Sequence, residues 1–208
     1  MKPVISKLGF FASLCLGLAG CASTGGSPDA LESSDPEATF DISGERVPSA
    51  NTLLTMAHIL AKNGNDPQCE IVLRKLIESH PDCGEAYNEL AELCMRQDRS
   101  EEAARVVEHG LEQLPHDPVL WNNLGMIQLL REDYEAAVEV FTSACAASPL
   151  DARPRANLAS AMAMQGRLEE AESLYMQALS RKDAYHNLAV LCRARGEHER
   201  ADWYRELA

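Results

Sequence analysis

Large and small apolar residues recur at fixed positions every 34 residues between residues 50 and 181. In the clearest unit, residues 118–151, positions 4, 7, 8, 20, 24, 27 and 32 hold Trp121, Leu124, Gly125, Ala137, Phe141, Ala144 and Pro149. The same positions in the neighbouring units hold comparable sets: Leu53, Met56, Ala57, Cys69, Leu73, Leu76 and Pro81; Tyr87, Leu90, Ala91, Ala103, Val107, Gly110 and Pro115; Arg155, Leu158, Ala159, Ala171, Tyr175 and Ala178. Four units in one register predict a repeat protein built from helix–turn–helix hairpins.

The chemistry of each position explains how such a hairpin packs. Small residues at positions 8 and 20 let the first helix (A) and the second helix (B) approach closely, and large apolar residues at positions 4, 7, 11 and 24 fill the space between units. The proline at position 32 ends helix B. Asp66 and Asp117 each precede a proline, so both are predicted N-caps. Three glycines are predicted to take the left-handed conformation that ends helix A: Gly64, Gly166 and Gly196.

This pattern resembles the tetratricopeptide repeat. The resemblance implies an all-α fold, a right-handed superhelical solenoid of helical hairpins over residues 50–208. The expected units are 50–83, 84–117, 118–151, 152–181 and 182–208. In the last unit Leu188 follows Leu158 after 30 residues instead of 34, so four residues are expected to be missing from the connection between helix B and the next helix A. The last unit should therefore pack at an altered angle.

The chain begins with Lys2 and Lys7, and an apolar stretch runs from Leu8 to Leu18. This layout is typical of a secretory signal peptide and is too short for a membrane span of about 20 apolar residues. The ending Leu18-Ala19-Gly20-Cys21 resembles the lipobox of bacterial lipoproteins, which implies removal of residues 1–20 and acylation of Cys21 with fatty chains such as palmitate. Because Ala22 is not the Asp that marks inner-membrane retention, the resemblance implies the periplasmic face of the outer membrane. A secreted chain with an incidental Cys21 is the alternative.

Residues 21–49 are rich in glycine, serine, proline and acidic residues, which predicts a disordered tether. About 28 flexible residues have a root-mean-square reach of roughly 30 Å, enough to lift the folded part off the membrane. The whole chain holds 19 basic and 32 acidic residues, a net charge of −13. Such a chain repels nucleic acid and anionic lipid, so no nucleic-acid partner is expected and membrane contact is assigned to the lipid anchor.

Cysteines and histidines show no spacing typical of a reactive or metal site. Five cysteines follow Cys21. Four of them stand at positions that face neighbouring helices, which predicts buried free thiols: Cys69, Cys94, Cys145 and Cys192. The exception is Cys83, which is expected in a turn. A Cys69–Cys83 or Cys69–Cys94 disulfide stays open as an alternative in an oxidising compartment. The histidines lack zinc-site spacing, so no metal and no other cofactor are expected. No nucleophile or phosphate-binding motif is present, and the chain is predicted to be non-enzymatic.

The A helices of such a stack line a concave surface, which is the expected binding site for protein partners. Positions 2, 5, 9, 12 and 13 of each unit should face this groove and give a candidate site: Leu54, His58, Asn88, Glu92, Met95, Asn122, Met126, Leu129, Leu130, Ser160, Ala163, Met164 and His186. Methionines suit an adaptable groove, and asparagine amides can hold a peptide backbone. Lys62 is the only lysine expected on this side, so capture of a C-terminal carboxylate is not favoured. Coverage of the groove by the tether or by a second copy is the alternative.

A lipobox, an acidic tether and these repeats together resemble the pilus-assembly lipoproteins of Gram-negative bacteria. The sequence AYHNLAVLCRARGE, residues 184–197, is most similar to the tight-adherence (Flp-type) pilus lipoprotein. This resemblance implies a scaffold that helps a secretin ring assemble or localise in the outer membrane. A general envelope adaptor, for example for peptidoglycan hydrolases, is the alternative function, and pairing of two copies through the terminal unit is also open.

Overall fold

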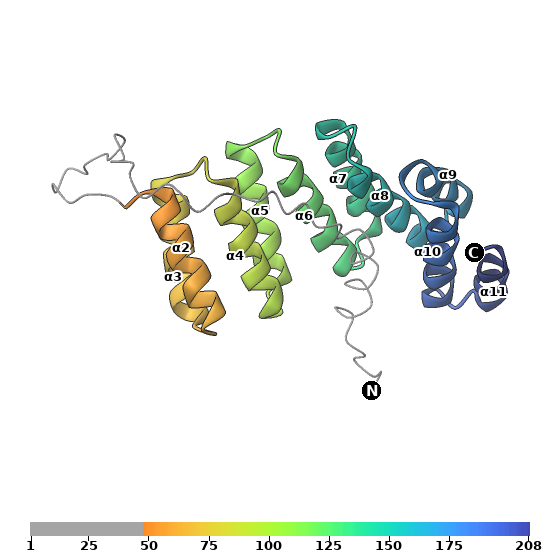
Figure 1. The fold of residues 1–208 in the computed structure, drawn as a ribbon, viewed down its shortest axis with the longest axis horizontal. Coiled ribbons are helices and arrows are strands. Elements are labelled where there is room, and N and C mark those ends of the chain that lie inside the picture. Colours follow the sequence, from red (N-terminus) through yellow and green to blue (C-terminus); the bar gives the residue numbers. More distant parts are fainter. Residues whose placement is uncertain (1–47) are drawn as a thin grey trace, which may run out of the picture.

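The computed structural model describes residues 48–208, so the predicted signal peptide, Cys21 and most of the predicted tether lie outside the described residues. The described part consists of ten α-helices without a strand (Figure 1). Their bounds are α2 Ala50–Lys62, α3 Asp66–Ser79, α4 Gly84–Arg96, α5 Ser100–Gln113, α6 Pro118–Leu130, α7 Tyr134–Ala147, α8 Ala152–Gln165, α9 Leu168–Ala178, α10 Arg181–Ala194 and α11 His198–Leu207. The predicted all-α fold is confirmed. None of the described helices is long and apolar enough to cross a bilayer.

Consecutive helices pair into hairpins, with the even-numbered helices as helix A and the odd-numbered helices as helix B. The small residues predicted between the two helices of a unit are all buried: Ala57, Ala91, Gly125, Ala159 and Ala189 in helix A, and Cys69, Ala103, Ala137, Ala171 and Ala201 in helix B. Gly125 shows why the position must be small. A Cβ atom there would lie 2.6 Å from the ring of Phe141 on the partner helix, closer than packed atoms approach.

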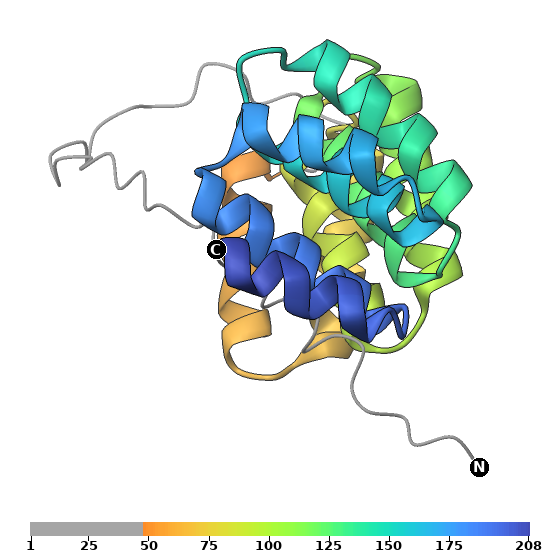
Figure 2. The same cartoon turned by 90° about the vertical axis from the view of Figure 1, so that its right-hand side faces the viewer.

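The hydrophobic core runs along the stack instead of gathering at one centre. One cluster joins α2 to α6, a second joins α6 to α8, and a third joins α8 to α11. Each hairpin is therefore stabilised mainly by its neighbours in the chain, as in other repeat proteins. The view along the long axis shows successive hairpins rotated relative to one another, so the stack winds as it advances (Figure 2).

A repeated hydrogen bond closes each regular junction between units. The residue at position 4 donates to the carbonyl oxygen of the proline that ends the preceding helix B. Tyr87 Oη lies 3.1 Å from the Pro81 oxygen, Trp121 Nε1 lies 2.9 Å from that of Pro115, and Arg155 Nη2 lies 2.7 Å from that of Pro149. Three different side chains thus bind the equivalent proline carbonyl in three successive units.

One residue in the turn after helix A takes a left-handed backbone conformation in every unit. Gly64, Gly166 and Gly196 have φ of 69°, 90° and 84°, as predicted. Asp98 and Glu132 stand at the equivalent positions and have φ of 61° and 65° without being glycine, which strains the backbone.

The two predicted aspartate caps differ in outcome. The Asp117 carboxylate accepts hydrogen bonds from the backbone N–H groups of Val119 and Leu120, at 2.8 and 3.1 Å. The prediction for Asp66 is wrong, because α3 begins at Asp66 itself and Asn65 occupies the cap position. The Asp66 carboxylate lies instead 3.5 Å from Arg96 at the end of α4.

The shortened last step falls partly inside a helix. α9 has 11 residues where α3, α5 and α7 have 14, and only Leu179 and Ser180 connect it to α10. The proline found at the other junctions is absent, so Tyr185 at position 4 has no proline carbonyl to bind. Its ring packs instead beside Tyr204, with the Arg181 guanidinium 5.4 Å from the ring centre. The sequence interpretation that all four missing residues belong to the connection is therefore too simple.

Candidate functional site

From α4 onwards, successive A helices lie closer together than successive B helices. α4 contacts α6, α6 contacts α8 and α8 contacts α10, whereas α3, α5 and α7 touch one another at most marginally. In a curved stack the helices converge on the inner side, so the A helices form the concave surface. We call this surface the groove.

Between α4 and α6 the groove contains a pocket of about 230 Å³. Its apolar lining consists of Ala91, Met95, Met126, Ile127 and Leu130, and its polar lining consists of Asn88, Glu89, Glu92 and Asn123. Flexible methionine side chains on both helices can adjust to an inserted side chain. Another hollow, of about 450 Å³, lies between α3 and α5, and its lining is the more polar of the two, with Arg74, Glu78, His109 and Gln113. The pocket in the groove is thus the better candidate for an apolar ligand group.

The structure brings together five of the side chains predicted to line the groove: Asn88, Glu92, Met95, Met126 and Leu130. Four lining residues were missed: Glu89, Ala91, Asn123 and Ile127. Glu89 and Asn123 both stand at position 6, one residue after the asparagines that were predicted. The adjacent Asn122 and Asn123, 34 and 35 residues after Asn88, were the available signal for this position.

Four predicted groove residues do not line the pocket, because their side chains are buried in other contacts. Leu54 and Leu129 belong to the hydrophobic core, Leu129 in the cluster that contains Phe141 and Leu158. The Ser160 hydroxyl is buried, donates to the Ala156 carbonyl at 3.0 Å and lies 2.6 Å from the Tyr175 hydroxyl. Ala163 is fully buried.

Two further predicted residues lie away from the pocket, towards the C-terminal end of the stack. Met164 is half-buried against the core of the last hairpins. His186 is exposed and lines a separate hollow with Val190, Arg193 and Arg205. The predicted set therefore does not form one continuous site.

Asparagine side chains bridge successive A helices in the groove. Asn123 Nδ2 donates to Asn88 Oδ1 at 2.8 Å, and Asn157 Nδ2 donates to Asn122 Oδ1 at 2.9 Å. Each pair uses one amide hydrogen and one carbonyl oxygen, so each asparagine keeps further bonding capacity for a peptide backbone. Asn122 contributes to this ladder and does not line the pocket.

His58 of α2 meets two carboxylates of α4 beside the pocket. Its Nε2 atom lies 3.2 Å from Glu89 Oε1 and 3.9 Å from Glu85 Oε1. Spacing along the sequence could not reveal this group, because the ligand atoms come from two helices. Within residues 48–208, these three side chains form a group whose donor atoms lie within 4.8 Å of one another and could hold a cation.

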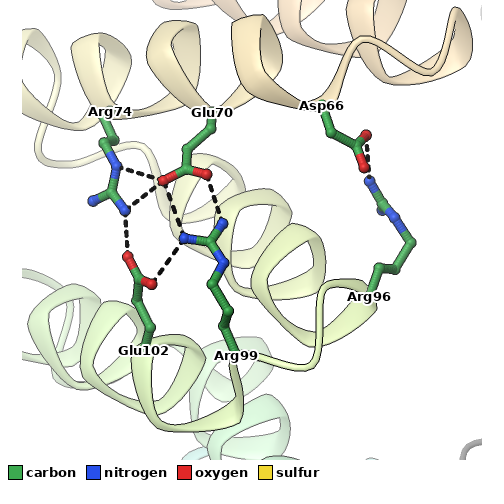
Figure 3. Close-up of polar contacts among 6 residues, drawn as sticks. All are labelled: Asp66, Glu70, Arg74, Arg96, Arg99 and Glu102. Atoms are coloured by element: carbon green, nitrogen blue, oxygen red, sulfur yellow. Dashed lines mark hydrogen bonds and ion pairs between the residues drawn. The ribbon is translucent and has the colours of Figure 1, made fainter.

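The outer side of the same two hairpins carries a closed network of charges (Figure 3). Arg99 donates to Glu70 at 2.6 Å and to Glu102 at 2.8 Å, and Arg74 donates to the same carboxylates at 2.8 and 2.5 Å. The hydrogen bond from Arg99 holds the pKa of the Glu70 carboxyl below its usual value. In return, chiefly the bond to Glu70 raises the pKa of Arg99. We call these four residues the outer network.

All five cysteines in the described part of the chain are free thiols. The open alternatives, Cys69–Cys83 and Cys69–Cys94, are not formed in this structure. Burial raises the pKa of the Cys69, Cys94, Cys145 and Cys192 thiols, which makes them poor nucleophiles at neutral pH. Cys69 lies in the core and donates a weak hydrogen bond to the Ala57 carbonyl.

The comparison with known families agrees with this architecture. Three family models, each described as tetratricopeptide repeat, match residues 85–127, 128–192 and 183–202. Together they span more than half of the 208 residues. The chain is a tetratricopeptide-repeat protein. In this tetratricopeptide-repeat protein, small buried residues let helix A and helix B approach closely in each unit. The contact of Gly125 with Phe141 is one example.

Three solved structures with the same fold have sequences that are 20% identical to this tetratricopeptide-repeat protein. PilW, described as a widely conserved type IV pilus biogenesis factor, is 20% identical with a TM-score of 0.62, over 74% of this chain and 74% of PilW. PilF of Pseudomonas aeruginosa is 20% identical with a TM-score of 0.59, over 76% of this chain and 74% of PilF. YrrB, described as a TPR protein with an unusual peptide-binding site, is 20% identical with a TM-score of 0.57, over 75% of this chain and 82% of YrrB. No curated protein matches the sequence significantly.

Proposed function

We propose that the protein is a non-enzymatic outer-membrane lipoprotein whose groove binds a protein partner during assembly of a tight-adherence or type IV-like pilus and its secretin. The observation that carries the proposal is the methionine-lined pocket between α4 and α6. It offers apolar burial together with asparagine amides, which is the combination that holds a peptide segment.

Two features support the pilus context. The residues Leu18 to Cys21 resemble a lipobox, and the acidic segment that follows would carry the repeats away from the membrane. The fold is shared with PilW, a pilus biogenesis factor by its description. The peptide-binding site named for YrrB supports the same mode of binding.

The experiment is the heat-resistant secretin multimer on a gel, measured in cells with and without this gene. We expect loss of the multimer in the deletion strain and its recovery with the wild-type gene. Cys21→Ala should fail to restore it, because the unacylated protein would not reach the membrane. Ile71→Glu is a matched control on the exposed face of α3 and should restore it fully, whereas Met95→Glu should not.

An unchanged multimer in the deletion strain would contradict the secretin role. Recovery by Cys21→Ala would contradict the anchor, and recovery by Met95→Glu would contradict the use of the pocket. A hydrolase captured by a crosslinker placed in the groove would favour the envelope-adaptor alternative.

A further inference from the structure

The groove has an acidic wall beside its apolar pocket. Glu85, Glu89 and Glu92 all lie on α4, and Glu89 and Glu92 line the pocket itself. The α6 side of the pocket contributes only neutral residues: Asn123, Met126, Ile127 and Leu130. The negative charge is thus confined to one edge of the pocket.

Two of these carboxylates have a histidine as their only ion-pair partner among the described residues. Among the described residues, Glu85 and Glu89 have no lysine or arginine partner and contact only His58. Glu92 has a loose contact with Arg96, at 3.4 Å. Like charges one helical turn apart repel each other, so a positive group that contacts the solvent-exposed side of Glu85 and Glu89, next to His58, would be stabilised.

The contrast with the outer network makes this arrangement informative. There, each carboxylate of Glu70 and Glu102 bonds to two arginines, and no charge is left for a partner. In the groove, Glu89 bonds to His58 alone among residues 48–208, and it also forms part of the pocket lining. The cation position and the apolar pocket therefore share a wall, so one segment could occupy both.

We propose that the groove recognises a protein segment that carries a lysine or arginine within about one helical turn of a large apolar side chain. The apolar side chain enters the pocket between α4 and α6, which at about 230 Å³ holds one such group. The basic side chain lies against the solvent-exposed side of Glu85 and Glu89, next to His58. This inference rests on the proposed function only in that the groove binds protein.

The test uses the full chain, purified in mild detergent and EDTA, on an array of 12-residue peptides. Each peptide has a central Leu in a Gly/Ser background and one Lys, Gln or Glu placed one to four residues away. We expect Lys peptides to bind roughly fivefold better than their Gln counterparts and Glu peptides to bind worst, with the preference shrinking in high salt. Peptides with the Leu replaced by Ser should not bind.

Matched variants locate the effect. Glu85→Gln/Glu89→Gln should lose the preference for Lys and keep the dependence on Leu. Glu108→Gln/Glu112→Gln removes an equally spaced exposed pair from α5 and should keep both.

The other outcomes overturn the inference in distinguishable ways. Leu-dependent binding without a charge preference would contradict the basic partner and leave the groove of the proposed function intact. Absence of Leu-dependent binding would contradict the pocket as well. Zn²⁺ in place of EDTA could also make Glu peptides bind better than Lys peptides. If this reversal requires both Glu85 and Glu89, the two glutamates would be assigned to a metal ion instead.

Discussion

The two sides of the first three hairpins use acidic residues in opposite ways. On the outer side, Glu70 and Glu102 of α3 and α5 are fully engaged by Arg74 and Arg99 (Figure 3). On the inner side, Glu85 and Glu89 of α4 face a histidine and an apolar pocket. Charges of the first kind fix one hairpin against the next, and charges of the second kind are available to a partner. The proposed binding site therefore lies where the protein's own ion pairs are incomplete.

The largest expected effect on stability comes from the apolar contact between helix A and helix B, not from either set of charges. Phe141 is fully buried against Gly125, and its replacement by Ala should lower the free energy of unfolding by about 3–5 kcal/mol, because it leaves a cavity between α6 and α7. Urea unfolding followed by circular dichroism measures this change. The exposed Ile71→Ala should change the value by less than about 0.5 kcal/mol. A loss below about 1 kcal/mol for Phe141→Ala would contradict the packing described for the hairpin.

The outer network should contribute a smaller but measurable amount. Arg99→Ala should cost about 1–2 kcal/mol, because it leaves Glu70 and Glu102 with only Arg74 in a partly buried position. Arg105, an exposed arginine on α5, is the control, and Arg105→Ala should cost less than about 0.5 kcal/mol. If the two substitutions changed the free energy of unfolding equally, the outer network would not contribute to stability more than an ordinary surface charge does.

The same network predicts a dependence on pH. The Glu70 pKa lies below its usual value of 4.5 because of the bonds from Arg99 and Arg74. A depressed pKa stabilises the folded state fully above 4.5, and this stabilisation disappears as the pH falls through the folded-state pKa. The stability difference between the wild type and Glu70→Gln should therefore shrink between pH 7 and pH 3 in urea titrations. A difference that is constant over this range would contradict the assignment.

The smallest effects concern the left-handed residue after helix A. Gly64→Ala should destabilise by about 1 kcal/mol through backbone strain alone, because a Cβ atom there meets nothing within 4 Å. Asp98→Gly, at the equivalent position of the next unit, should relieve strain and stabilise by about 0.5 kcal/mol. Thermal unfolding of both variants measures the two changes in melting temperature. If both substitutions shifted the melting temperature in the same direction, the equivalence of positions 64 and 98 would be contradicted.

The repeat pattern predicted the fold well because its causes are local. The close contact of Gly125 with Phe141 follows from residue size at fixed spacing within one hairpin, and the left-handed glycines follow from backbone freedom. The groove was predicted less accurately. Leu129 and Ser160 were assigned to the surface by their position in the repeat, but packing of the following helices buries both.

The charged groups could not have been found from spacing. Arg99 meets Glu70 across 29 residues and His58 meets Glu89 across 31, so neither pair matches the 34-residue period. Which acidic residues are neutralised depends on side-chain directions between neighbouring helices. This information is present only in the packed structure.

The most direct test of the central claim is photo-crosslinking in cells from two positions of the full chain. A photoreactive residue at Met95 lies in the pocket, and one at Ile71 lies on the exposed face of α3. The account predicts one discrete protein adduct from position 95, absent from position 71 and lost when Glu85→Gln/Glu89→Gln is added. Identical adducts from both positions, or an adduct only with a second copy of this chain, would contradict a groove built for a separate protein partner.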